Sequence, residues 1–266
     1  MNKLLRLLLP NSISTYFNTI QQRIIQLEKT VHNQKRMIRN MEFTVETLIS
    51  SPKFEYSDEI GMNWQNERKK IVSHIITNSN IDAIVETGTF IGNTTGYLHI
   101  KYNLPVYTCE LNHQFFLLSQ SRLKDLKQVY FHNSDSRSFL KSLTKSELAH
   151  SNIFFYLDAH WYNDLPLREE ISIICKNWRN FAIMVDDFEV PGDSGYGYDD
   201  YGPGKALNLK HIEDLLNEYK LKPFFPSINS ENETGSKRGC VVLAPEGKLM
   251  VELTKIKSLI QFNNSF

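Results

Sequence analysis

The spacing of apolar residues near the start of the chain predicts one long helix with a continuous apolar stripe. The residues that form this stripe recur alternately four and three positions apart, and they are Ile13, Phe17, Ile20, Ile24, Leu27, Val31, Ile38, Met41, Val45 and Leu48. Gln34 is the polar residue that interrupts the series. Repeated heptads are typical of a coiled coil, in which a lone polar seam residue helps to set register or strand number. We therefore expect residues 13–50 to form a coiled-coil helix that self-associates as a dimer or trimer. The alternative is a long helix packed against its own domain.

A second pattern, in which short apolar runs alternate with helical periodicity, fills the rest of the chain. The predicted strands are Ala83–Glu86, Val106–Glu110, Val129–Asn133, Ile153–Asp158 and Ala182–Asp186. The predicted helices are 92–102, 113–126, 136–147, 165–178 and 205–219. Near-continuous apolar strands are typical of a parallel sheet that is covered by helices on both faces. Lys222–Ser227 and Gly239–Ala244 bracket a polar loop and predict an antiparallel strand pair. The sequence thus predicts an α/β fold, a doubly wound Rossmann-like sheet of five parallel strands plus a C-terminal antiparallel pair.

These patterns divide the chain into four parts. We expect an N-terminal segment at 1–12, the coiled-coil oligomerisation helix at 13–50, a linker and lead-in helix at 51–79, and one globular domain at 80–266. The helical pattern of the lead-in part runs roughly from Glu59 to Thr77, with Trp64, Ile71, Ile75 and Ile76 on one side. Pro52 ends the first helix, because the residue before a proline disfavours the α conformation. No apolar run reaches the roughly 18 residues that a membrane span needs. We expect no transmembrane segment, and leave open a short contact of residues 1–12 with a membrane or a partner.

Charge and cysteine content narrow the classes of partner and compartment. Thirty basic residues balance thirty acidic ones, which argues against a nucleic-acid binder held by phosphate contacts. The cysteines Cys109, Cys175 and Cys240 are odd in number and far apart, so they form neither a disulfide framework nor a metal knuckle. We therefore expect a cytoplasmic protein.

The first predicted strand leads into a glycine turn, within Ile84–Thr95. Gly88 and Gly92 permit close backbone approach, and the helix that follows offers free N–H groups. A dinucleotide site would prefer three glycines in a G-x-G-x-x-G pattern. Here the glycines are four apart and Glu86 precedes them. This segment resembles the first motif of the class I S-adenosylmethionine-dependent methyltransferases, E/D-x-G-x-x-x-G, which wraps the amino acid end of the cofactor.

Two further acids follow predicted strands at the intervals of the same family. The resemblance implies that Glu110, at the end of the second strand, accepts both ribose hydroxyl hydrogens. It also implies that Asp135, after the third strand, meets the adenine amino group, with Ser136 beside it. The cofactor-binding residues that the resemblance implies are Glu86, Thr87, Gly88, Gly92, Thr94, Thr95, Glu110, Asp135, Ser136 and Asp158.

Three carboxylates follow the fourth and fifth predicted strands. Asp158 comes after one strand, and Asp186 and Asp187 come at the end of the next. Because neighbouring parallel strands end at one edge of a sheet, these side chains should converge, and without a cation they would repel each other. A hard divalent ion resolves this repulsion, so we predict a site for Mg²⁺ or another divalent cation formed by these three residues.

This cluster resembles that of the metal-dependent O-methyltransferases of the catechol and caffeoyl-CoA kind and of related sugar O-methyltransferases. Those enzymes carry an Asp after the fourth strand and an Asp-Asn pair after the fifth. The present chain has Asp187 in place of the Asn, and Trp161 in place of a lysine three residues after the first Asp. We expect His160 to replace that lysine as general base, with Asp158 as the second catalytic residue. A metal-free site that uses His160 and Asp158 remains the alternative.

A glycine- and tyrosine-rich segment, 189–204, follows the fifth predicted strand. Long irregular segments in compact domains are usually lids or binding loops. We predict a lid whose residues Tyr196, Tyr198 and Tyr201 contact a polyhydroxylated or aromatic acceptor.

The resemblance implies methyl transfer from S-adenosylmethionine to a hydroxyl of a small molecule, sugar or glycan, and the carboxylate cluster adds the expectation that Mg²⁺ assists it. Two alternatives stay open. One is a catalytically inactive Rossmann-like scaffold organised by the coiled coil, and the acids at four strand ends argue against it. The other is a different nucleotide-cofactor α/β enzyme acting on sugars, which the absence of a three-glycine motif disfavours.

Overall fold

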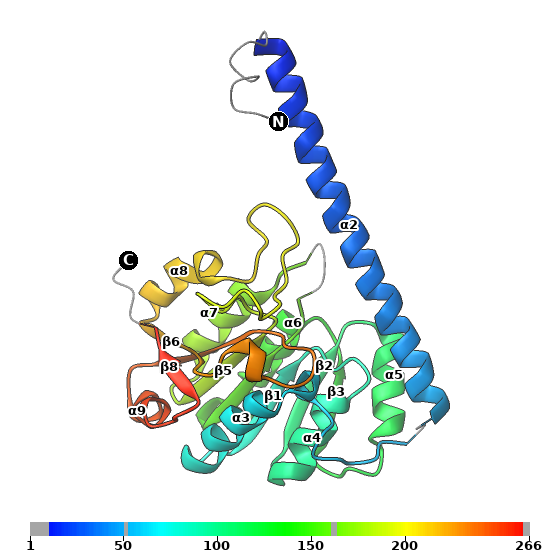
Figure 1. The fold of residues 1–266 in the computed structure, drawn as a ribbon. Helices are drawn as coiled ribbons and strands as arrows, with labels where there is room; N and C mark the ends of the chain where they lie inside the picture. Colours follow the sequence, from blue (N-terminus) through cyan, green and yellow to red (C-terminus); the bar gives the residue numbers. More distant parts are fainter. Residues whose placement is uncertain (1–10, 51–52, 161–163, 263–266) are drawn as a thin grey trace. The chain divides into compact units, whose positions relative to one another are not determined.

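The computed structural model describes residues 11–50, 53–160 and 164–262, and it separates into two compact units (Figure 1). One unit contains the helix α2, which spans Asn11–Ser50 without interruption. The predicted long helix is therefore present and begins two residues earlier than expected. Residues 1–10 of the predicted N-terminal segment lie outside the described residues. The pairing of α2 with another helix stays a prediction.

The second unit is built around one eight-stranded sheet. Its strands are β1 Ala83–Thr87, β2 Val106–Glu110, β3 Val129–Asn133, β4 Ile153–Leu157, β5 Phe181–Asp186, β6 Leu221–Pro226, β7 Cys240–Pro245 and β8 Leu259–Gln261. Their order across the sheet is β3-β2-β1-β4-β5-β7-β6-β8. Strands β1 to β5 are parallel, and β7 runs antiparallel to both β5 and β6. The predicted doubly wound α/β fold is confirmed.

Helices cover both faces of this sheet. They are α3 Asn66–Asn78, α4 Asn93–Tyr102, α5 His113–Arg122, α6 Ser136–Leu143, α7 Leu167–Asn177, α8 Leu209–Glu218 and α9 Lys248–Thr254, with the short turns η1 Met62–Trp64, η2 Glu147–His150 and η3 Ser230–Asn232. Apolar residues of α6, α7 and α8 pack on one face, and those of α3, α4 and α9 pack on the other (Figure 1). Alternate residues of each central strand enter the two cores: Phe155 and Ile183 enter one, and Phe154 and Met184 the other. This alternation explains why these strands read as unbroken apolar runs.

The C-terminal region contains more structure than the sequence predicted. Helix α9 has seven residues, and β8, which pairs antiparallel with β6, has three. Elements this short carry less than two helical turns or two strand alternations, so periodicity does not reveal them.

The lead-in helix expected from Glu59 begins later, because the backbone before it is left-handed. Met62, Asn63 and Trp64 all have positive φ, which a right-handed α-helix excludes, so α3 starts at Asn66. Trp64 is 41% exposed and does not join the apolar side of the helix.

The order of the strands determines where a ligand can bind. The sheet runs outward from β1 through β2 to β3 in one direction and from β4 to β5 in the other. Open α/β sheets bind ligands beyond the carboxyl ends of the strands at such a reversal point. In the part of the chain that the structure describes, no helix has the length and apolar character of a membrane span.

Candidate functional site

The glycine turn after β1 lies directly against the end of β4. Gly88 has φ +89°, and a Cβ atom at this position would lie 2.3 Å from the carbonyl oxygen of Asp158. Gly92 has φ +81°, and its Cβ would lie 2.5 Å from Cδ1 of Leu123. Only glycine fits both the backbone conformation and the space. The turn therefore brings the start of α4 to the reversal point of the sheet.

Glu86 is buried beneath this turn. Its carboxylate accepts hydrogen bonds from the hydroxyl groups of Thr95 (2.5 Å) and Thr108 (2.7 Å). Burial raises the pKa of Glu86 to about 7, although the two hydroxyl groups act in the opposite direction. In this structure, Glu86 ties β1 to β2 and α4.

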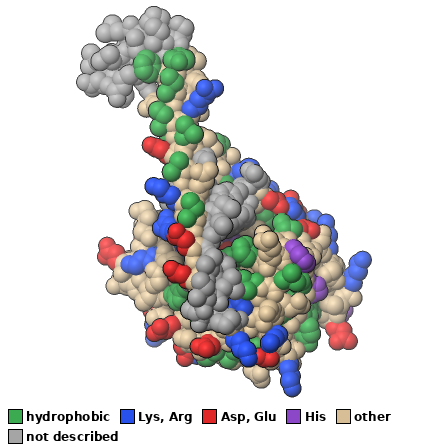
Figure 2. Space-filling model, turned by 90° about the vertical axis from the view of Figure 1, so that its right-hand side faces the viewer, with side chains coloured by type: hydrophobic (Ala, Val, Ile, Leu, Met, Phe, Trp, Pro, Cys, Tyr) green, Lys and Arg blue, Asp and Glu red, His purple; other side chains and the backbone are tan. Residues whose placement is uncertain are grey.

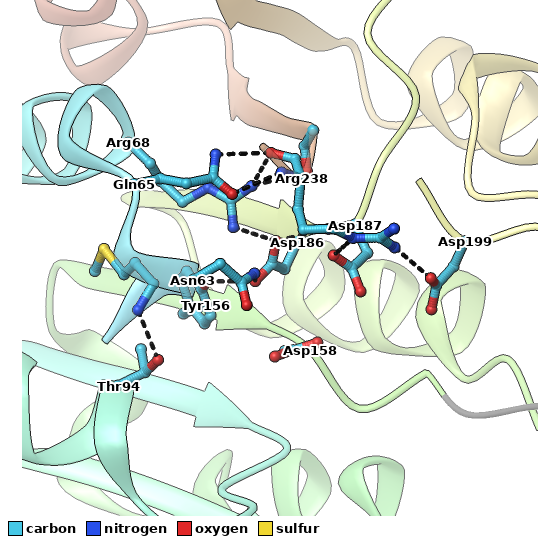
Figure 3. A network of polar contacts seen from close by, with 12 residues as sticks. Asn63, Gln65, Arg68, Thr94, Tyr156, Asp158, Asp186, Asp187, Asp199 and Arg238 are labelled. Atoms are coloured by element: carbon cyan, nitrogen blue, oxygen red, sulfur yellow. Dashed lines mark hydrogen bonds and ion pairs between the residues drawn. The ribbon is translucent and has the colours of Figure 1, made fainter. Parts of the chain in front are cut away.

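The two other threonines that were predicted to bind the cofactor differ in environment. Thr87 is fully buried as the last residue of β1. The Thr94 hydroxyl lies in the first turn of α4 and accepts a hydrogen bond from the backbone N–H of Met62 (3.1 Å). Thr94 thus connects the glycine motif to the left-handed turn that precedes α3 (Figure 3).

Glu110 ends β2 as predicted, next to the glycine turn. Its two carboxylate oxygens accept the backbone N–H groups of Phe90 and Asn112, each at 2.8 Å. Partial burial raises the pKa of Glu110, and these N–H groups partly oppose that effect. The bonds hold the carboxylate at the carboxyl edge of the sheet.

Asp135 follows β3 and caps α6. Its carboxylate accepts the backbone N–H groups of Arg137 (3.1 Å) and Ser138 (3.2 Å). Hydrogen bonds from Ser138 and Arg137 lower the pKa of Asp135. Ser136, the first residue of α6, is buried beside it. Arg137 also forms two hydrogen bonds to Asp164 (2.9 and 2.6 Å), which links this region to the chain that follows β4.

Asp158, His160 and Asp187 form the acidic cluster after β4 and β5. Among the described residues, one ligand atom from each of these three lies within 4.8 Å of the others. Nε2 of His160 is 3.7 Å from Oδ1 of Asp158. His160 and Asp187 are buried, whereas the Asp158 side chain is 40% exposed. The cluster therefore opens to solvent on the side of Asp158. Trp161 lies outside the described residues.

Asp186, which was expected in this cluster, is turned away from it (Figure 3). Its carboxylate forms a buried ion pair with Arg68 and accepts hydrogen bonds from the hydroxyl of Tyr156 (2.6 Å) and the amide of Asn63 (3.1 Å). Asp186 is the last residue of β5, whereas Asp187 follows the strand with a left-handed φ of +54°, so the two adjacent carboxylates point in different directions. His160 occupies the place in the cluster that was assigned to Asp186.

Arg238 is a site residue that the sequence did not reveal. Its Nε atom lies 2.5 Å from Oδ1 of Asp187, and another of its nitrogens pairs with Asp199. Arg238 lies two residues before β7, and an antiparallel strand begins at the edge where its parallel neighbour β5 ends. This placement was the one available signal for it in the sequence.

The tyrosine-rich segment 189–204 is partly built into the domain. Tyr196 is buried, and its hydroxyl donates to the carbonyl of Ile228 (3.1 Å), so it does not face an acceptor as predicted. Tyr198 is exposed, and Tyr201 belongs to the other compact unit, together with α2. The backbone N–H of Asp199 donates to the carbonyl of Asp187 (2.9 Å), which fixes this part of the segment beside the cluster.

The fold resembles that of solved methyltransferase structures. An O-methyltransferase from Bacillus cereus in complex with SAH is 13% identical, with a TM-score of 0.53 over 78% of this chain and 89% of that chain. An O-methyltransferase from Streptomyces achromogenes involved in tomaymycin synthesis, in complex with SAM, is 17% identical, with a TM-score of 0.50 over 68% of this chain and 80% of that chain. No protein-family model and no curated protein sequence matches the chain. At these identities, the likeness establishes a shared methyltransferase fold.

Proposed function

We propose that this protein transfers a methyl group from S-adenosylmethionine to a hydroxyl group of a small molecule, sugar or glycan. The observation that carries the proposal is the convergence of five strand ends on one edge of the sheet. That edge presents the Gly88–Gly92 turn, Glu110, Asp135, and the cluster of Asp158 and Asp187. The solved structures of this fold that contain SAH or SAM support the same cofactor here.

The residues along this edge suit the parts of the cofactor. The glycine turn leaves room for close backbone approach at the start of α4, where the amino acid end would lie. Glu110 would accept the hydrogens of the ribose hydroxyl groups, and Asp135 would accept one from the adenine amino group. When bound, S-adenosylmethionine supplies an activated methyl group. The contribution of the protein is to align the acceptor with it, which can lower the barrier by roughly 7–11 kcal/mol.

The acidic cluster fits a divalent cation such as Mg²⁺. The Asp158 and Asp187 carboxylates converge within 4.8 Å, and hard cations prefer such oxygen ligands. A bound cation would act as a Lewis acid toward the acceptor oxygen. His160 lies within the same distance, close enough to accept the proton of a hydroxyl group held there. Asp186 has no part in this proposal, since Arg68 neutralises it.

The acceptor would lie between this cluster and residues 189–200 of the tyrosine-rich segment. Tyr198 is exposed one residue before Asp199, whose backbone is bonded to that of Asp187. An exposed aromatic ring beside carboxylates suits a polyhydroxylated or aromatic acceptor.

The chain is further expected to self-associate through α2 as a dimer or trimer. Of the stripe residues whose burial is described, Ile20 is half-buried, and the others are each between 43% and 62% exposed: Phe17, Ile24, Leu27, Val31 and Ile38. Hydrophobic side chains gather along this helix in Figure 2. A second copy would remove them from water. The cytoplasmic location expected from the cysteines stays a prediction.

Calorimetric titration with S-adenosylhomocysteine tests the proposed function, with Mg²⁺ and with a chelator. We expect binding by the wild-type protein, and at least a tenfold weaker affinity for Glu110→Ala, a loss of about 1.4 kcal/mol. Glu218→Ala, at the exposed end of α8, is the matched control and should bind like wild type. Absence of binding in every condition would contradict the proposal. If binding and turnover are the same with and without the chelator, only the proposed cation site is contradicted, and the proposed methyl transfer stands.

A further inference from the structure

Arg238, Asp187 and Asp199 form a closed ring of contacts at the edge of the acidic cluster (Figure 3). The Arg238 guanidinium pairs with Asp187 through Nε and with Asp199 through a second nitrogen. The ring is completed by the backbone, because the N–H of Asp199 donates to the carbonyl of Asp187 (2.9 Å). It therefore joins three separate segments: the end of β5, the start of β7 and the 189–204 segment.

The ring lies in surroundings that strengthen its contacts. The exposed fractions of the side chains are 7% for Asp187, 1% for Asp199 and 20% for Arg238. A guanidinium is a rigid planar fork that can hold two carboxylates at once, and charge-assisted hydrogen bonds are stronger away from water. A lysine ammonium has the same positive charge, but it is concentrated on one nitrogen and cannot hold two carboxylates in a planar fork.

The backbone of Asp187 needs such support. Its φ is +54°, a left-handed conformation that is unfavourable for a residue other than glycine. Contacts among the described residues hold it there: its N–H donates to Oδ1 of Asp186 (2.7 Å), its carbonyl accepts from Asp199, and its carboxylate pairs with Arg238. This conformation sends the Asp187 side chain toward Asp158 and His160, whereas Asp186 points to Arg68.

We infer that Arg238, held in turn by Asp199, is a positioning residue that presents the Asp187 carboxylate to the cation. The inference rests on the proposed function.

The position and the charge of Arg238 have opposite effects on cation affinity, and this makes a test possible. Removal of a positive charge beside Asp187 would by electrostatics alone strengthen cation binding. Loss of the correct carboxylate geometry would weaken it. Arg238→Lys keeps the charge and removes the fork, so it isolates geometry. Arg238→Gln removes both.

The experiment measures Mn²⁺ binding by electron paramagnetic resonance on the full-length chain, and SAH affinity by calorimetry. We expect Arg238→Lys and Arg238→Gln both to bind Mn²⁺ at least tenfold more weakly, with SAH affinity unchanged. Arg168→Lys is the matched control, since Arg168 forms a forked pair with Asp214 (2.7 and 2.6 Å) between α7 and α8. It should bind Mn²⁺ like wild type.

The remaining outcomes separate this inference from the proposed function. Wild-type Mn²⁺ affinity in folded Arg238→Lys, or tighter binding in Arg238→Gln, would overturn the positioning role and leave the cation site standing. A parallel loss of SAH affinity would also overturn it, because it would indicate a general structural role. A wild-type protein that binds no Mn²⁺ would refute the cation site and this inference together. If the Arg238 variants do not fold, the Asp199→Asn variant tests the inference instead, and we expect it to bind Mn²⁺ severalfold more weakly than wild type.

Discussion

At the scale of single residues, two buried glutamates lie beneath the carboxyl edge of the sheet. Glu86 lies buried in β1 under the glycine turn, and Glu170 lies buried in the first turn of α7, each with 1% of its surface exposed. Burial raises the pKa of each to about 7, and hydroxyl groups of neighbouring Thr and Ser side chains oppose that effect. Both acids therefore keep their proton to a higher pH in the folded protein than an exposed glutamate does.

We predict that these glutamates make the protein less stable as the pH rises. The folded-state pKa of about 7 lies above the ordinary value of 4.5, so the folded state binds more protons between these values and its stability falls as pH rises through 7. Each glutamate can contribute up to about 3 kcal/mol. Urea unfolding should give a lower free energy of unfolding at pH 8.0 than at pH 5.5. The difference between the two pH values should be about half as large in Glu170→Gln as in wild type. The adjacent exposed Glu169→Gln is the control, and an undiminished decrease in Glu170→Gln would contradict the assignment.

At the scale of elements, the 40-residue helix α2 carries an apolar stripe, and most of its described side chains are exposed. Helices of this length are stabilised mainly by packing of an apolar face. The heptad spacing of the stripe identifies which exposed isoleucines belong to it. Ile24 lies in the stripe and Ile25 lies beside it, although both are about half exposed.

We predict that Ile24→Glu abolishes self-association, whereas Ile25→Glu preserves it. A charge at a seam position must be buried between helices, while a charge one residue away stays in water. Light scattering coupled to size exclusion should give the mass of one chain for Ile24→Glu, and of a dimer or trimer for Ile25→Glu and wild type. The same mass for both variants would contradict the heptad seam and favour the alternative, a long helix packed against its own domain.

At the scale of the whole molecule, a buried ion pair connects the helix that precedes the sheet to the end of its fifth strand. Arg68 of α3 is 1% exposed and pairs with Asp186 at the end of β5. Its guanidinium also donates to the carbonyl groups of Arg238 and Gly239, at the start of β7. The segment before β1 is thus bonded to the end of β5 and to the residues just before β7, which lie more than 100 residues later in the chain.

We predict that Arg68→Met destabilises the globular unit by about 3–5 kcal/mol, because it leaves the Asp186 carboxylate buried without its cation. The second substitution Asp186→Asn should recover part of this loss, since it removes that charge. Lys70→Met is the control on the same helix, because Lys70 pairs with Glu67 at the surface and its replacement should leave the free energy of unfolding nearly unchanged. Chemical denaturation measures all four proteins. A loss under 1 kcal/mol in Arg68→Met would contradict the role of the pair.

Local pattern explains how much of the fold and of the site could be predicted. Val106–Glu110 and Val129–Asn133 are strands with the predicted bounds, because a short run of β-branched and aromatic residues is a local property of the chain. The placement of Glu110, Asp135 and Asp158 along one edge also followed from sequence, since parallel strands end on the same side of a sheet.

By itself, then, the sequence determined the α/β class, the long helix and the edge at which the acids gather, all of which depend on periodicity and strand direction. The tertiary structure alone decided which acids face the cluster. Asp186 and Asp187 are neighbours in the chain, yet one pairs with Arg68 and the other with Arg238. It likewise buried Tyr196 and brought His160 beside Asp187. The physical reason is that side-chain direction and ion-pair partners depend on segments far apart in sequence, whose approach only the packed fold defines.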